Sequence, residues 1–140
     1  MIVSNDGDDR QKITVGGTPP LSTADASVAD GDGTLLLVPD GRSEEQAALI
    51  AADYTDRIPN APDASGCWRA TDWMVVPALA ISIELDAGEK FRGGYAVLAA
   101  PDSGECLSPG EYRIEDTIHV TTPGGSDTVA LSFSIHVGSR

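Results

Sequence analysis

The two cysteines are the residues of this chain whose chemistry is easiest to define. Cys67 follows Gly66 and Cys106 follows Gly104-Glu105, so both lie in turn-rich segments. In an oxidising compartment they would pair, and closing a loop of this length would stabilise the fold by roughly 3–5 kcal/mol. We therefore expect a Cys67–Cys106 disulfide, with two buried free thiols as the alternative. A catalytic thiol is disfavoured because both histidines fall on candidate strand faces, with no sign of pairing with a cysteine.

The histidines, His119 and His136, are the next candidates, because imidazole can bind a metal or transfer a proton. Both fall on the polar side of two alternating segments near the C-terminus, where they could be cross-strand neighbours. A metal site would need at least one more ligand, for which Asp116 and Asp127 are the nearby candidates. We expect instead two exposed histidines on a solvated face, and no metal.

Two acidic clusters invite a calcium interpretation. They are Asp6-Gly7-Asp8-Asp9 and Asp30-Gly31-Asp32-Gly33, and the second has the alternation with which a calcium loop begins. It lacks the further oxygen ligands and the bidentate Glu that complete such a loop. We expect solvated loops, with opportunistic cation binding as the alternative. The chain also has no serine-hydrolase elbow, phosphate loop or zinc spacing, so we expect no cofactor and no enzyme activity.

Large aromatic residues are few, at 5% of the chain, so each one matters to the prediction. Trp68 stands next to Cys67 and is predicted to pack over the disulfide rather than to bind a sugar. Trp73 is followed by Met74, and this pair is our candidate for an exposed interface anchor, because buried aromatic anchors dominate many protein interfaces.

The charge of the chain excludes some partners. Its 140 residues carry 22 acidic and 9 basic side chains, a net charge of −13. Such a chain cannot neutralise a row of phosphates, so nucleic-acid binding is disfavoured. High salt screens the self-repulsion of so many carboxylates. Abundant surface carboxylates with only two lysines therefore predict a halophilic source; a merely acidic soluble protein is the alternative.

No segment is expected to span a membrane. The longest apolar run, 74–83, contains Pro77 and is far shorter than a spanning helix. Residues 1–11 have neither the basic nor the apolar part of a signal peptide and are predicted to form a polar arm. We expect a protein of the extracellular space or of a particle surface, whose leader was removed or which leaves the cell inside a virus particle.

The elements that must position these residues are short strands. Glycine and proline punctuate the chain, and apolar residues alternate with polar ones, most clearly at 111–121 and 128–137. We expect loops at 21–33, 55–66 and 101–110. The predicted strands cover residues 12–15, 34–38, 67–70, 73–76, 80–85, 91–99, 111–121 and 128–137. This pattern predicts an all-β protein, an antiparallel sandwich of about seven to eight strands in one domain, 12–140, behind the arm.

Residues 43–54 are the ambiguous stretch. Ser43-Glu44-Glu45-Gln46 fits a helix capping box and helix formers follow it. The apolar run is short, however, and ends in Tyr54-Thr55, which favour strands. We favour a strand here, with a short helix as the alternative.

Three motifs carry a resemblance to a known family. The segment Leu107-Ser108-Pro109-Gly110-Glu111-Tyr112-Arg113 resembles the L-x-P-G-x-Y-R segment that opens the penultimate strand of bacterial and archaeal immunoglobulin-like domains akin to the intracellular proteinase inhibitors. Leu85-Asp86-Ala87-Gly88-Glu89 is similar to their L-x-P-G-E turn, with Ala87 in place of proline. The run that includes Gly66-Cys67-Trp68-Arg69 looks like a haloarchaeal branch of secreted or lipid-anchored envelope proteins.

This resemblance covers roughly residues 47–137 and implies an immunoglobulin-like β-sandwich at a surface. It does not carry over the protease-inhibitor role, since no inhibitory loop can be matched. The sequence differs from the lipid-anchored members of this branch in showing no leader, which argues against an anchored-lipoprotein role.

The function that these observations favour is a non-enzymatic structural or assembly module, on a virion surface or in a cell envelope. It predicts contacts with other protein chains, or self-assembly, through residues 1–11 or 73–80. The alternative is an adhesion module that binds carbohydrate or protein through the loops at one end of the sandwich. A protease inhibitor or an enzyme is the least favoured hypothesis.

Overall fold

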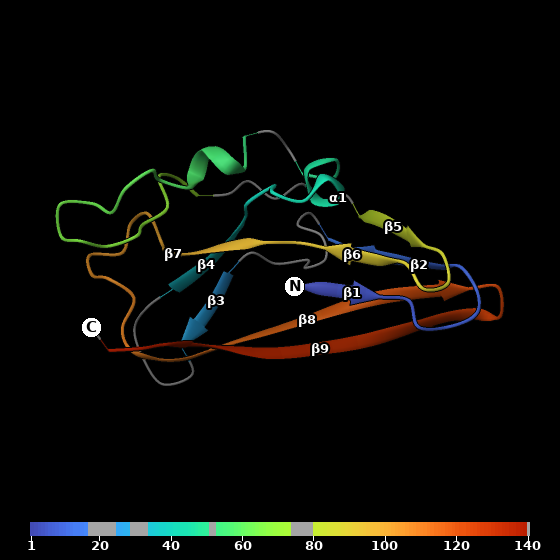
Figure 1. The fold of residues 1–140 in the computed structure, drawn as a ribbon. Helices are drawn as coiled ribbons and strands as arrows, with labels where there is room; N and C mark the ends of the chain where they lie inside the picture. Colours follow the sequence, from blue (N-terminus) through green and yellow to red (C-terminus); the bar gives the residue numbers. More distant parts are fainter. Residues whose placement is uncertain (17–24, 29–33, 51–52, 74–79, 140) are drawn as a thin grey trace.

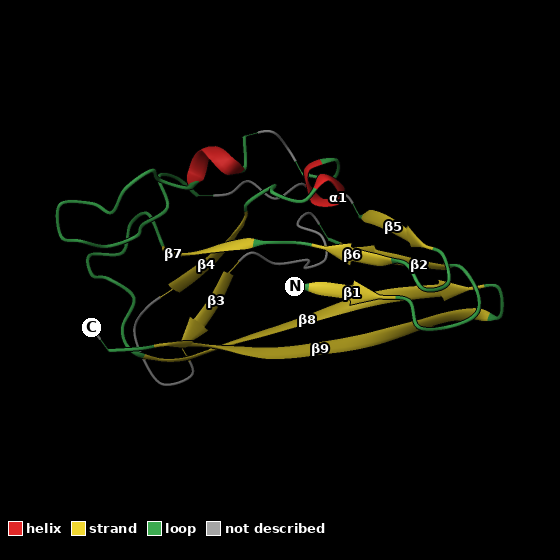
Figure 2. Cartoon of the chain, in the orientation of Figure 1, coloured by secondary structure: helices red, strands yellow, loops and turns green. Residues whose placement is uncertain are grey.

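The chain folds as an all-β protein in a computed structural model that describes residues 1–16, 25–28, 34–50, 53–73 and 80–139. A two-stranded sheet joins β1 (Ile2–Ser4) to β6 (Lys90–Arg92), and a seven-stranded sheet contains the other strands. These are β2 (Gln11–Val15), β3 (Asp25–Val28), β4 (Thr34–Pro39), β5 (Ile81–Leu85), β7 (Tyr95–Ala99), β8 (Gly110–Thr122) and β9 (Gly125–Val137). Every strand pair is antiparallel, as predicted for a sandwich (Figure 2). The immunoglobulin-like order of strands stays a prediction.

The hairpin β8–β9 runs the length of the molecule (Figure 1). Its ladder extends from Gly110 opposite Val137 to Thr122 opposite Gly125. On its other side β8 pairs with β2 near Thr121 and with β3 near Tyr112. The alternation of apolar and polar residues predicted for this hairpin is confirmed, because inward-facing side chains of β8 are buried while their neighbours in the sequence are exposed.

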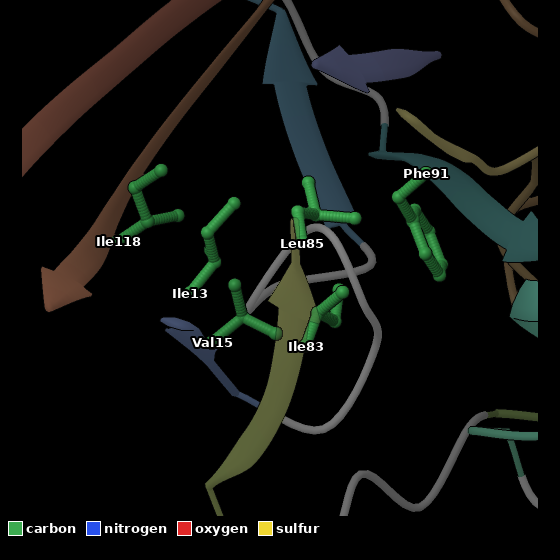
Figure 3. Close-up of a cluster of buried hydrophobic side chains, with 6 residues drawn as sticks. All are labelled: Ile13, Val15, Ile83, Leu85, Phe91 and Ile118. Carbon is green, nitrogen blue, oxygen red and sulfur yellow. The ribbon is translucent and has the colours of Figure 1, made fainter. Parts of the chain in front are cut away.

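We call the end of the molecule where β1, β2, β5 and β6 lie over the hairpin the sheet end. A cluster of buried apolar side chains lies there, separate from the clusters around β4. Its buried members are Ile13, Val15, Ile83, Leu85, Phe91 and Ile118 (Figure 3). Phe91 comes from the two-stranded sheet, so this cluster joins the two sheets.

Strand β4 is covered on both faces. Leu35 and Leu37 pack with Tyr112 and Ile114 of β8, whereas Leu36 and Val38 pack with Ala70 and Leu98 on the opposite side. An unbroken apolar run is typical of a strand buried on both faces. The segment 53–73 therefore acts as a further layer over β4 and β7.

The polar arm predicted at residues 1–11 is replaced in the structure by β1 and a structured loop. Ile2 pairs with Arg92, and the N-terminal amine donates a hydrogen bond to the Gly93 carbonyl at 2.7 Å. Asn5, which follows β1, is only 1% exposed. Strand β1 pairs with β6, which lies far away in the sequence, so local composition could not reveal β1.

The strand favoured at 43–54 is also wrong for residues 43–50 and 53–54, while residues 51–52 lie outside the described residues; the short-helix alternative is correct for the beginning of the stretch. Helix α1 spans Glu44–Ala47, and the Ser43 side chain accepts a hydrogen bond from the Gln46 N–H at 3.2 Å. Tyr54 precedes a short 3₁₀-helix, Thr55–Arg57. The loop predicted at 55–66 thus begins with one helical turn.

Three further boundaries differ from the prediction. The loop expected at 21–33 contains β3, which pairs with β4 and β8. The strand expected at 67–70 is an extended segment with one isolated bridge, Arg69 to Ala99. Of the strand expected at 73–76, Trp73 lies outside any strand and the remainder lies outside the described residues.

The strand predicted at 91–99 is divided into β6 and β7 at Gly93-Gly94. A Cβ atom on Gly94 would lie 2.5 Å from a carboxylate oxygen of Asp40, and the Gly94 carbonyl accepts the Asp40 N–H at 3.0 Å. The chain therefore passes from one sheet to the other at a glycine, where a Cβ atom would require the Asp40 carboxylate to move.

Candidate functional site

The predicted disulfide is present. Cys67 and Cys106 are bonded, their Cα atoms are 5.3 Å apart, and they are separated by 39 residues. The bond joins two loops, and Cys67 is buried. It fixes the segment 53–73 to the segment 100–109, which together we call the loop end of the molecule.

Asp63 organises the first of these loops. One carboxylate oxygen accepts hydrogen bonds from the Ser65 hydroxyl at 2.6 Å and from the backbone N–H groups of Ser65 and Cys67 at 2.9 and 3.0 Å. These hydrogen bonds favour the ionised carboxylate and hold the pKa of Asp63 well below its usual range. The turn places Cys67 where it can reach its partner cysteine.

Arg69 connects this turn to the second loop. Its Nε donates to the other Asp63 oxygen at 3.0 Å, while another guanidinium nitrogen donates to the carbonyl groups of Ala100, Ser103 and Glu105. One side chain with several fixed donors can bind a carboxylate and a row of carbonyls together. The Gly-Cys-Trp-Arg motif thus joins the two loops both covalently and by hydrogen bonds.

Tyr112 anchors the start of β8 beneath these loops. Its side chain is fully buried, and its hydroxyl donates to the Ser108 carbonyl at 3.0 Å. A tyrosine that bonds back to the backbone a few residues upstream is a feature of immunoglobulin-type sandwiches, the tyrosine corner. The contact explains why the Leu-x-Pro-Gly-x-Tyr-Arg segment opens this strand, and it fixes residues 107–109.

An open hollow of about 590 Å³ lies beside the disulfide at the loop end. Its walls come from residues 67–68, Val97 of β7, residues 106–107 with Pro109, and residues 135–138. We refer to this site as the hollow. Most of its lining is apolar, and His136 is the ionisable side chain among the described residues that line it.

The predicted packing of Trp68 over the disulfide as a core residue is wrong. Trp68 is 48% exposed, and it lines the hollow together with both cysteines. Successive side chains of an extended segment point to opposite sides, so the burial of Cys67 directs Trp68 outward. The result is a large aromatic side chain presented to solvent on a backbone fixed by a disulfide.

The histidines are exposed but are not cross-strand neighbours, which corrects the sequence interpretation. His119 lies opposite Thr128, and its Nδ1 is 3.2 Å from the threonine hydroxyl. His136 lies opposite Glu111, with 3.9 Å between ring nitrogen and carboxylate. A hydrogen bond donated by Ser134 is the main reason why the pKa of Glu111 is lowered.

The remaining candidates occupy other places. Trp73 is 43% exposed and is not among the residues that line the hollow, and Met74 lies outside the described residues. The first acidic cluster lies in the exposed loop after β1, and residues 30–33 fall outside the description. Within the described part of the chain no three metal-binding side chains come together, Asp116 and Asp127 included. Nor does that part contain a helix long and apolar enough to cross a membrane.

Two residues that shape this site, Asp63 and Arg69, were not singled out in the sequence. Asp63-Ala64-Ser65 carries a recognisable signal, because an aspartate often accepts the N–H two residues further on. Arg69 carries no such signal, since its acceptors on residues 100–105 are distant in the sequence.

Comparison with known proteins adds no relative: no protein-family model, no curated protein and no solved structure matches this chain.

Proposed function

We propose that this protein is a non-enzymatic, immunoglobulin-like structural or assembly module on a surface, either of a virion or of a cell envelope, in a halophilic archaeal system. The observation that carries the proposal is the hollow with Trp68 exposed at its wall. A concave, mostly apolar site with one protruding tryptophan is suited to a side chain of a protein partner.

The frame around the hollow supports binding more than chemistry. The disulfide, the Asp63–Arg69 pair and the Tyr112 hydroxyl hold its walls before any partner arrives. A site fixed in advance loses less conformational entropy on binding. A hydrolytic site, by contrast, needs several polar groups that converge on one point. Among the described residues, His136 and Glu111 sit at the rim on an exposed strand face.

The charge supports the environment in the proposal. A net charge of −13 on a chain of this size produces strong self-repulsion in dilute buffer, which salt screens. We expect the midpoint of thermal unfolding to rise steadily between low salt and about 3 M sodium chloride, where the Debye length is under about 3 Å. A midpoint that does not change with salt would contradict the halophilic part of the proposal.

Carbohydrate binding is the second candidate, favoured by Trp68 standing in the same hollow as His136. An aromatic ring can cover the face of a sugar while a nearby polar pair, here His136 with Glu111, binds hydroxyl groups. The apolar lining makes this the weaker candidate.

Co-sedimentation of the purified chain with the envelope or particle fraction of its host, in multimolar salt, tests the proposal. We expect Trp68→Ala to weaken binding at least about tenfold, as loss of a central aromatic anchor does. Trp73→Ala is the comparison variant: Trp73 is similarly exposed but is not among the residues that line the hollow, so a loss of binding in this variant instead would place the contact at the anchor predicted from the sequence.

A glycan array on the same proteins separates the two candidates. Glycan binding that Trp68→Ala abolishes would replace the protein partner with a sugar. Equal binding by the wild type and Trp68→Ala in both assays would contradict a function for the hollow.

A further inference from the structure

The outer edge of β9 is the longest strand edge without a partner in the described part of the fold. The strand has 13 residues, about twice the length of a typical strand. Its ladder to β8 has no bulge, and β8 is the strand with which it pairs. An unpaired edge presents a row of backbone N–H and C=O groups that can extend the sheet.

The other sheet edges are short and guarded, whereas this one is neither. Strand β5 has five residues and carries Glu84, which approaches Arg10 at 3.9 Å. Strand β7 also has five residues, and its Ala99 N–H already donates to the Trp68 carbonyl at 2.9 Å. Strand β9 contains neither proline nor lysine, and its one charged side chain, Asp127, lies beside the hairpin turn.

The inward side chains of β9 are incompletely covered. Leu131, Phe133, Ile135 and Val137 are only half-buried, and Val129 is 39% exposed. Their counterparts on β8, such as Tyr112 and Ile114, are fully buried. A strand added beside β9 would therefore bury apolar surface as well as satisfy the backbone groups.

We propose that the occupant of this edge is a second copy of the chain, which adds its own β9 antiparallel across a two-fold axis. The charge distribution is compatible with this partner. Two chains of net charge −13 repel each other over most of their surface, but the ten residues 128–137 contain no Asp, Glu, Lys or Arg. Two acidic copies that approach along this long strand therefore bring no like charges opposite each other.

The strand is also complementary to itself. When the two-fold axis passes beside one residue, a residue n positions before it in one copy pairs with the residue n positions after it in the other copy. The two paired residues are therefore always an even number of positions apart in the sequence. Apolar residues alternate along β9, so they all remain on one face of the extended sheet. With the axis at Ser132, Asp127 faces Val137 of the second copy and not another Asp127. Such an isologous contact is the commonest arrangement in soluble oligomers.

Sedimentation equilibrium at the lowest salt concentration that keeps the chain folded tests this pairing, because multimolar salt would screen the repulsion between introduced lysines. We expect the wild type to dimerise, and the double variant Ala130→Lys/Ser132→Lys to dimerise at least about tenfold more weakly, because lysines then face each other across an axis at 130–132. The matched control is Thr117→Lys/His119→Lys, which adds the same number of lysines to exposed positions of the central strand β8. It should dimerise like the wild type.

Amide hydrogen exchange of the wild type is the second measurement, and it does not depend on how any variant folds. We expect alternate amides of β9 to become more protected as protein concentration rises. A wild type that stays monomeric at every concentration, or a lysine edge variant that dimerises like the control, would overturn the proposal. The lysine substitutions leave the lining of the hollow unchanged, since neither Ala130 nor Ser132 belongs to it, although Ile135, His136 and Val137 belong to both the hollow and β9.

Discussion

Two loops at opposite ends of the molecule are built in the same way from different side chains (Figure 1). In the loop after β1, Asn5 accepts the Gly7 N–H at 3.0 Å. In the loop end, Asp63 accepts the Ser65 N–H at 2.9 Å. Asn5 is buried and neutral, whereas Asp63 is partly exposed, ionised and paired with Arg69.

The difference shows what each end contributes. A buried amide can satisfy its surroundings without the cost of burying a charge, and Asn5 also donates to the carbonyls of Asp9 and Leu85 at 2.7 and 2.9 Å. A carboxylate at the surface keeps its hydration and can hold a turn with ionic hydrogen bonds. The sheet end therefore relies on burial, while the loop end relies on a disulfide and charged contacts to fix a binding surface.

The largest expected effect comes from removing the disulfide. Cys67→Ser/Cys106→Ser, or reduction of the wild type, should lower the free energy of unfolding by about 4 kcal/mol for a loop of this length. Denaturant unfolding with and without reductant measures this loss. Amide exchange should rise first in residues 53–73 and 100–109 and last at the sheet end. Equal loss of amide protection at both ends would contradict the view that the disulfide stabilises mainly the loop end.

Asn5→Ala should cost about 2 kcal/mol, because it leaves buried carbonyl groups without a donor. Asn5→Asp should cost more at neutral pH, since it places a negative charge against two carbonyl oxygens. The matched exchange at the other end, Asp63→Asn, should cost less than either. Thermal unfolding of the three variants measures these costs. If Asp63→Asn were the most destabilised, the contrast between a buried Asn5 and a partly exposed Asp63 would be contradicted.

Tyr112→Phe removes only the hydroxyl that donates to Ser108 and should lower stability by about 1 kcal/mol. The ring stays in the core, so the effect belongs to the hydrogen bond beneath the loop end. Chemical denaturation measures it, with an unchanged denaturant dependence as the sign that the fold is intact. A loss as large as that from Asn5→Ala would contradict the proposed ranking.

The smallest effect is a pH dependence at Asp63. Because folding lowers the pKa of Asp63, its contribution to stability is complete above the unfolded pKa, about 4, and is lost as pH falls towards the folded pKa. The difference in unfolding free energy between the wild type and Asp63→Asn should therefore decrease as the solution is acidified below about pH 4. Unfolding midpoints between neutral and acidic pH check this; a gap that stays constant would show that the carboxylate charge is not what matters.

The parts of the fold that followed from the sequence are those with a local signal. The strands at 111–121 and 128–137 were found because period-two alternation and a turn at Pro123-Gly124 lie within one continuous stretch. Helix α1 was anticipated as an alternative because Ser43 and Gln46 make their capping contact within one turn. The disulfide followed from cysteine number and context alone.

What could not be predicted depends on distant partners. Strand β1 is short, and it forms because Ile2 meets Arg92. The division of the predicted strand at 91–99 depends on the approach of Asp40 to Gly94. The hollow assembles from four separate segments, so no stretch of sequence describes it. Trp68 was predicted to pack over the disulfide because it stands next to Cys67, although extended geometry directs adjacent side chains to opposite sides.

The central position of β8 also decides when the chain can fold during synthesis. Strands β2 and β3 end by Val28, yet both pair with β8, which begins at Gly110. On a ribosome adding roughly 5–20 residues per second, the N-terminal strands wait several seconds for this partner. Contacts between such distant segments also make folding slow compared with that of a helical chain of the same size. The nascent protein can therefore pair β2 with β5 and β3 with β4, but the other edges of β2 and β3 have no partner until β8 emerges; its many carboxylates help to keep that chain soluble.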